Sequence, residues 1–284
     1  GSLDYALAGD AVRFPETIAN IRLLRQSLVA PRLGQSYDNY YDLTGKELNP
    51  TEWVTKSILQ VDSGSYGVEG PYNEILDSNH VILNLDLTIT DKNTVEGTMD
   101  IAWSGYWNTA SDAKHNTDKF MKRCLSAYVT KPEITSFNVK ALESSLGTTH
   151  MICTFKGTME LDEFEDDLLI YRIPACPYGF GGEEMRLNQK RNRIHDLILD
   201  RAVEQNETIR IKFPKKWAFK KGLPDKTFTS EAGSFNCKTE VSNIQKDSQD
   251  EPTLLLKRSI RIPDKIIKAS DFVDFLTIWQ LLTI

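Results

Sequence analysis

Apolar and polar residues alternate most strictly between Val81 and Trp103. From Val81 to Ile89 every odd-numbered residue is valine, leucine or isoleucine, which places these side chains on one face of a strand. The polar residues 91–94 then turn the chain, and the alternation resumes from Val95 onward. This pattern predicts a β-hairpin with one buried face.

A helix and several strands are expected after the hairpin. One apolar stripe at helical spacing ends before Pro132 and consists of Phe120, Met121, Cys124, Leu125 and Tyr128. Strands are then expected over 134–142, 150–161 and 168–173, followed by a loop rich in proline and glycine over 174–182. Together with the hairpin, these elements make a β-rich domain at 76–200 with one helix.

The last eighty residues predict a second β module. Strands are expected over 209–213, 228–230, 234–241 and 254–262. Ser270 is expected to cap a final apolar helix that carries Phe272, Phe275, Leu276 and Trp279. Since this helix would close the core of the C-terminal domain, that domain is expected to unfold in a chain cut before Ser270.

Residues 1–75 show the least regular pattern. A helical stripe from Ile18 to Leu28 ends before Pro31, and a polar, turn-rich segment follows it. We therefore predict a mainly β fold with two β-sandwich-like domains and a few accessory helices. The domains are expected at 76–200 and 201–284, preceded by a helical or irregular segment at 1–75. A length of 284 residues suits this division.

Composition and charge narrow the class of protein. With 40% hydrophobic and 26% charged residues, the chain is expected to fold in water. A net charge of −6 argues against general affinity for nucleic acid. No apolar run reaches the roughly 18 residues that a membrane-spanning helix needs. The chain begins with Gly1-Ser2, typical of a cleaved affinity tag, so its start gives no information about compartment.

Cysteine and histidine spacing predicts neither a metal site nor a cofactor. Cys124, Cys153, Cys176 and Cys237 lie at least 23 residues apart, and no cysteine–histidine spacing typical of zinc sites occurs. Buried free thiols and a disulfide formed in an oxidising compartment both remain open for these residues. His80, His115, His150 and His195 receive no role.

Cys176 is the one candidate for nucleophilic catalysis. It lies in the proline- and glycine-rich loop, whereas Cys124 and Cys153 occupy positions that predict burial. The loop lacks the spacing of a phosphate-binding loop. A cysteine enzyme is therefore the weakest of the functions considered, and no catalytic residue is assigned.

Two charged runs are better explained by ordinary surface structure. The acidic run from Glu160 to Asp167 lacks the glycine typical of calcium loops and is expected to be a solvated turn between strands. The run from Lys212 to Lys221 interleaves lysine with Phe213, Trp217 and Phe219. This predicts a strand whose rings pack inward while its lysines face water, rather than a surface for nucleic acid or anionic membrane.

The densest aromatic cluster is the candidate ligand site. If exposed, Trp103, Tyr106 and Trp107 would offer a platform for a carbohydrate or a peptide. The alternative is that Trp103 ends a strand, Gly105 marks a bend and the rings cap the core. Exposure of the rings in one groove would favour ligand binding, and their burial would exclude it.

Three local patterns from Trp103 to the C-terminus carry a resemblance to a known family. They are a strand with Gly97 leading to Ser104-Gly105-Tyr106; Lys190–Ile194 before a strand that ends in Phe213-Pro214; and Leu223-Pro224, Gly233-Ser234-Phe235 and a closing helix with Phe272 and Phe275. In this order they resemble the β-rich domains of unknown function that follow the transglutaminase-like core in Bacteroides-type envelope proteins. The resemblance covers about two thirds of the chain.

The resemblance implies a non-catalytic accessory or binding module outside the cytoplasm, in the periplasm or cell envelope. Catalysis in that family belongs to an upstream Cys-His-Asp core, and residues 1–75 match neither its cysteine-containing helix nor its histidine-containing strand. The implied partners are a protein or an envelope glycan, with no cofactor. The alternative is an envelope protein that binds carbohydrate or peptide through Tyr106 and Trp107.

Overall fold

The structure is a computed structural model that describes a large part of the chain. The described residues are 3–10, 26–31, 56–62, 65–69, 79–90, 93–143, 147–159, 161–164, 168–180, 196–199, 202–219, 224–242, 251–263 and 266–283. Before residue 79, the description is limited to the backbone and the pairing of its strands.

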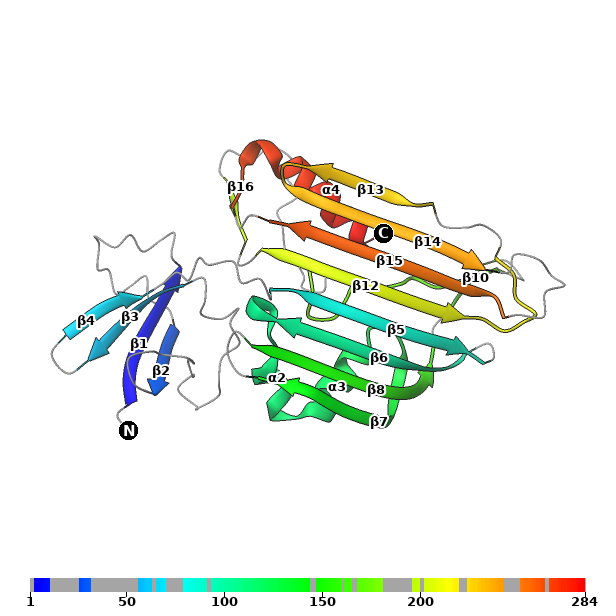
Figure 1. Ribbon diagram of the computed structural model, residues 1–284, viewed down its shortest axis with the longest axis horizontal. Helices are drawn as coiled ribbons and strands as arrows, with labels where there is room; N and C mark the ends of the chain where they lie inside the picture. The colour runs from blue at the N-terminus through cyan, green and yellow to red at the C-terminus, as the bar shows by residue number, and fades with distance from the viewer. Residues whose placement is uncertain are drawn as a thin grey trace.

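One eight-stranded sheet spans residues 81–262 in the order β13-β14-β15-β12-β5-β6-β8-β7 (Figure 1). Its strands are β5 (Val81–Ile89), β6 (Thr94–Ser104), β7 (Thr130–Leu142), β8 (Thr148–Thr158), β12 (Val203–Lys212), β13 (Lys226–Ser230), β14 (Gly233–Ser242) and β15 (Thr253–Ile262). Neighbouring strands are antiparallel, except that β5 and β12 run parallel at the centre. The parallel pair joins two antiparallel four-stranded halves into one sheet.

The expected boundary near residue 200 falls between strands that pair with each other. Val81 of β5 lies opposite Gln205 of β12, and Thr88 lies opposite Lys212. The mainly β fold is confirmed, but one sheet with one continuous core replaces the two expected sandwich-like domains. A sandwich needs a second sheet facing the first, and helices and a loop occupy that position here.

Three helices in the described ranges lie on one face of the sheet, behind it in the view of Figure 1. They are α2 (Ala110–His115), α3 (Thr117–Leu125) and α4 (Phe272–Thr283), with single 3-10 turns at Gly105–Trp107 and Ala269–Asp271. The Asn116 side chain caps α3 by accepting a hydrogen bond from Lys119 N at 2.9 Å. The sheet therefore has an inner face that carries the core and an outer face that these helices leave uncovered.

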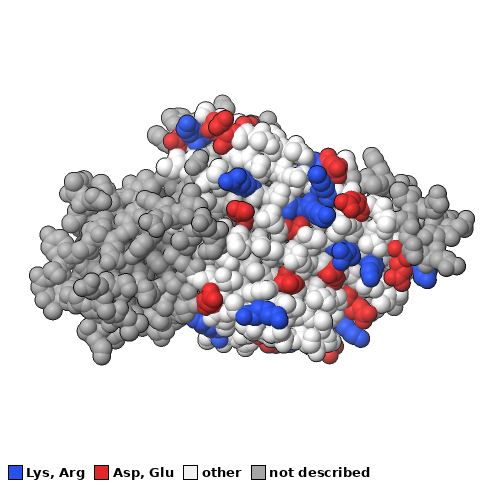
Figure 2. Space-filling model, viewed as in Figure 1, with Lys and Arg blue, Asp and Glu red and all other residues white. Residues whose placement is uncertain are grey.

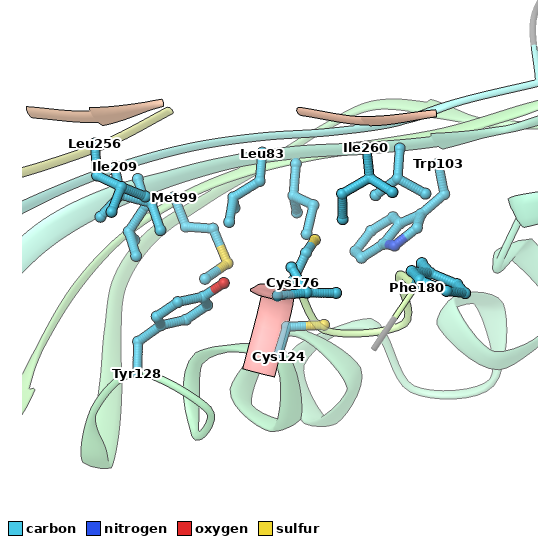
Figure 3. Packing of buried hydrophobic residues seen from close by; sticks show 14 of the residues in the cluster. Leu83, Met99, Trp103, Cys124, Tyr128, Cys176, Phe180, Ile209, Leu256 and Ile260 are labelled. Atoms are coloured by element: carbon cyan, nitrogen blue, oxygen red, sulfur yellow. The ribbon is translucent and has the colours of Figure 1, made fainter. Parts of the chain in front are cut away.

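Strict alternation explains which side chains reach the core. The odd-numbered residues of β5 are buried, and β6 follows β5 as the expected antiparallel hairpin partner. Apolar residues from the inner face and from the helices meet in one layer, in which Leu83, Met99, Trp103 and Ile260 point from the sheet toward Cys124 and Tyr128 (Figure 3). Burial of each large apolar side chain contributes about 1.5–3 kcal/mol to stability.

The N-terminal part forms a separate antiparallel sheet rather than the helical or irregular segment expected. Its strands are β1 (Leu3–Asp10), β2 (Gln26–Pro31), β3 (Lys56–Asp62) and β4 (Ser65–Glu69), in the order β2-β1-β3-β4. Leu28 is the last residue of the expected helical stripe, but it lies in β2, where it pairs with Ala6 of β1. The remainder of that stripe lies outside the described residues.

Two short strand pairs complete the described structure. They are β9 (Asp162–Phe164) with β10 (Leu168–Ile170), and β11 (Leu197–Ile198) with β16 (Ile266–Ile267). In the second pair, the segment before β12 lies against the segment before α4. This pairing ties the start of the C-terminal helix to the middle of the chain.

Candidate functional site

The aromatic cluster lies in the core. The exposed fractions of Trp103, Tyr106 and Trp107 are 0%, 2% and 3%. Trp103 Nε1 donates a hydrogen bond to Pro177 O, and Trp107 Nε1 donates to Ala202 O, each at 3.2 Å. Because the rings offer no accessible face for stacking on a sugar, the structure contradicts a ligand-binding platform at these three residues.

A bend at Gly105 turns the cluster inward. Gly105 has φ +63°, and a Cβ at this position would come within 3.0 Å of the Asn79 backbone. The Asn79 side-chain oxygen accepts a hydrogen bond from Tyr106 N at 3.0 Å, which fixes the turn immediately after β6. The alternative interpretation of this segment, a bend with rings that cap the core, is confirmed.

The most polar buried group in the described core is an ion pair between Glu207 and Arg258. The two residues lie opposite each other on β12 and β15, on the inner face, with side-chain exposures of 0% and 6%. Arg258 Nη2 lies 2.5 Å from Glu207 Oε2, and Gln205 Nε2 donates to Glu207 Oε1 at 2.6 Å. Their mutual attraction and the hydrogen bond from Gln205 offset the free-energy cost of removing both charges from water.

This ion pair holds a loop against the sheet. Arg258 Nη2 also donates to Pro174 O at 2.5 Å, and Gln205 Oε1 accepts from Phe180 N at 2.7 Å. A Cβ at Gly179 would overlap the Gln205 side-chain oxygen, so a larger residue there would displace the Gln205 amide from this position. The described part of the proline- and glycine-rich loop is therefore anchored at Pro174 and at Phe180 and packs as part of the core.

Cys176 lies inside that loop and is fully buried. Burial, assisted by the nearby Glu207 carboxylate, raises the pKa of its thiol well above the usual value. Its Sγ donates to Pro177 O at 3.6 Å, while His80 and His150 bond to Ser104 and Asp100 instead. None of the hydrogen bonds found among the described residues joins this thiol to a histidine, and a buried, protonated thiol is poorly suited to nucleophilic attack.

The other cysteines among the described residues are also free thiols. Cys124 and Cys153 are buried, and burial raises the pKa of Cys153 to about 11. Figure 3 shows Cys124 on α3 and Cys176 on the loop within the same apolar layer. No group of three or more histidine, cysteine or acidic residues in the described ranges could hold a metal ion.

The two charged runs are only partly described. Asp162 lies in β9, 3.9 Å from Arg172, while Glu160 and Glu165–Asp167 lie outside the described residues. In the lysine-rich run, the strand ends at Lys212, so the expected longer strand is wrong. Phe213 nevertheless packs against Trp217 and Phe219, with ring centroids 6.1 and 5.1 Å apart, while Lys215 and Lys216 are exposed.

The outer face of the sheet is an accessible surface that no described helix covers. Its centre, which we call the open face, consists of Asn84, Asp86, Thr98, Asp100, Thr208 and Arg210. Asp86 pairs with Arg210 across the parallel strands at 2.9 Å, and Asp100 pairs with His150 at 2.8 Å. Basic and acidic residues are interspersed with uncharged ones on the surface seen in Figure 2, so neither sign dominates there.

Comparisons with protein-family models, curated proteins and solved structures found no match to this chain. Among the described residues, no helix is both long and apolar enough to cross a membrane.

Sequence reasoning missed Gln205, Glu207 and Arg258, although the sequence contains a signal for them. Glu207 and Arg258 occupy inner-face positions in runs whose neighbours on that face are Ile209, Leu256 and Ile260. A charged residue at an apolar-face position predicts a buried partner. The identity of that partner depends on the pairing of β12 with β15.

Proposed function

We propose that this chain is a non-catalytic accessory and binding module of an extracytoplasmic transglutaminase-like protein. One observation carries the proposal: the described residues best suited to chemistry or stacking, Cys176 and the aromatic cluster, form the core. The open face, in contrast, presents hydrogen-bonding side chains over several strands. A module of this kind acts through its surface.

The family assignment rests on the resemblance, and the structure gives its motifs a physical role. A Cβ at Gly97 would overlap Asp86 O, which explains glycine where β6 passes close to β5. Gly105 makes the bend after β6, and Gly233 begins β14. Phe272 and Phe275 on α4 are fully buried. These residues therefore have structural roles in this chain, whereas Lys190–Ile194 lies outside the described residues.

An open, polar sheet face suits an extended partner. Small-molecule sites are concave and enclose most of their ligand. A face of threonine, asparagine and paired charges instead offers many modest hydrogen bonds spread over a wide area. We therefore infer a protein or envelope glycan as the partner, and the upstream Cys-His-Asp core of the same protein is the first candidate.

The test exchanges charges on the open face without removing an ion pair. In the double variant Asp86→Arg/Arg210→Asp, the cross-strand pair is kept but the surface charge is reversed at both positions. We expect the affinity for the separately expressed upstream core to fall roughly tenfold or more. Calorimetric titration measures the affinity, and an unchanged melting temperature shows that the fold is kept.

A matched control makes the same exchange on the helix layer. Asp118 and Lys122 form an exposed i,i+4 pair on α3, 2.9 Å apart, and Asp118→Lys/Lys122→Asp reverses it. This control is expected to bind like the wild type. Equal losses in both variants would contradict a role for the open face. A full-length sequence with a cytoplasmic start and no upstream core would contradict the family assignment.

A further inference from the structure

Strand β7 is a long, open edge of the sheet. It has 13 residues and pairs only with β8, so its other side carries no strand among the described residues. The opposite edge, β13, has only five residues. Long open edges present unpaired backbone donors and acceptors to other chains, whereas short edges limit such pairing.

The apolar residues of β7 are irregularly spaced but lie on one face. Ile134, Phe137, Val139 and Leu142 pair with inner-face residues of β8, although they are separated by three, two and three positions. The register shifts between Ile134 and Ser136, and again between Val139 and Ala141. Each shift takes up one extra residue, which returns the next apolar side chain to the inner face.

This spacing is symmetric about Asn138. Phe137 and Val139 lie one residue from it on either side, and Ile134 and Leu142 lie four residues from it. Two antiparallel copies of β7 related by a two-fold axis at Asn138 would therefore place Phe137 opposite Val139 and Ile134 opposite Leu142. Every facing pair on the inner side would be apolar.

The inner side of this edge is also incompletely covered. Phe137 and Val139 are 38% and 39% exposed, whereas Cys153 and Met151, which lie opposite them on β8, are 1% and 0% exposed. The apolar layer thus continues from the core onto the edge strand and ends in solvent. A neighbouring strand with apolar residues at matching positions would extend this layer.

We propose that two copies of this chain associate through β7, pairing antiparallel about Asn138 to join their sheets edge to edge. An unrelated strand could pair with β7 if it carried apolar residues at alternating positions, as β8 does. A two-fold interface additionally requires that each residue match its symmetry partner, and the symmetric spacing of β7 meets this requirement. The second copy of the chain is therefore the occupant that the edge fits best.

The polar residues at the centre of β7 are compatible with this register. Ser136 falls opposite Lys140, and Asn138 meets its own copy on the axis. Glu133 falls opposite Glu143, the first residue after β7, and these like charges disfavour pairing at the two ends. The dimer is independent of the binding function proposed above, because β7 lies at the sheet edge and the open face is centred on β5, β6 and β12.

A cysteine on the axis tests the register directly. Residues directly opposite on antiparallel strands have Cα atoms about 4.5–5.5 Å apart, within the range that a disulfide bridges. In a Cys237→Ser background, Asn138→Cys is expected to form a disulfide-linked dimer under mild oxidation. The matched variant Asn206→Cys places an exposed cysteine on β12 and is expected to stay monomeric on a non-reducing gel.

Sedimentation velocity of the wild-type chain provides the second readout. A lysine on the inner side of the edge strand opposes pairing, so Val139→Lys is expected to weaken self-association roughly tenfold or more. Ile82→Lys, at a residue 37% exposed on β5, is the matched control and is expected to associate like the wild type. A wild-type chain that stays monomeric at high micromolar concentration, or equal cross-linking of both cysteine variants, would overturn the dimer.

Discussion

A chain that ends at Ala269 is expected to be unfolded from β5 onward, not only after residue 200. Helix α4 contributes five buried apolar side chains to the core: Phe272, Phe275, Leu276, Ile278 and Leu282. Their burial contributes about 7–15 kcal/mol, comparable to the whole stability of about 5–15 kcal/mol typical of a domain. Because β12 pairs with β5 in one sheet, loss of the C-terminal half is expected to destabilise β5–β8 as well.

Circular dichroism during thermal unfolding measures this effect. The truncated chain is expected to show no cooperative transition, while Val273→Ser, at an exposed position on α4, is expected to melt near the wild-type temperature. An unchanged melting temperature after truncation would contradict the role assigned to α4. A surviving transition from β5–β8 alone would show that the two halves of the sheet fold independently.

Arg258→Met is expected to lower the free energy of unfolding by about 3–5 kcal/mol, because it leaves the Glu207 carboxylate buried without a cation. The same change removes the donor to Pro174 O and loosens the loop that contains Cys176. Denaturant unfolding followed by the fluorescence of the buried tryptophans measures the loss.

The double variant Arg258→Met/Glu207→Gln separates the charge effect from simple loss of packing. Its glutamine oxygen still accepts from Gln205 Nε2, and no unpaired charge remains in the core. Arg258 Nε is buried without a hydrogen-bond partner among the described residues, so its removal carries no loss there. The double variant is expected to recover most of the stability. A double variant as unstable as Arg258→Met would show that the ion pair is not the cause.

Local sequence patterns predicted the elements better than their assembly. The strict alternation from Val81 to Ile89 depends only on the side-chain period of a strand, and the hairpin of β5 and β6 follows from it. The parallel pairing of β5 with β12 joins residues more than 100 positions apart, such as Val81 and Gln205. Neither strand contains a local sequence pattern that identifies the other as its neighbour. The sequence therefore predicted two domains, whereas the structure has one sheet.

Whether an aromatic cluster lies in the core or on the surface was likewise decided by tertiary structure. Trp103, Tyr106 and Trp107 fit both a binding platform and a core, and the bend at Gly105 against Asn79 determines the outcome. On β7, the spacing of Ile134 and Phe137 broke the alternation expected of a strand. A register shift restores it, and such shifts depend on the neighbouring strand.

The central claim is that the described groups best suited to chemistry belong to the core, and thiol labelling tests it most directly. The native chain is treated with iodoacetamide at neutral pH, and the modified cysteines are identified by mass spectrometry. Cys124, Cys153 and Cys176 are buried, and burial raises their pKa values, so they are expected to stay unmodified until the chain unfolds. The half-buried Cys237 is expected to react slowly. Rapid modification of Cys176 in the folded protein would contradict the account and favour a cysteine enzyme.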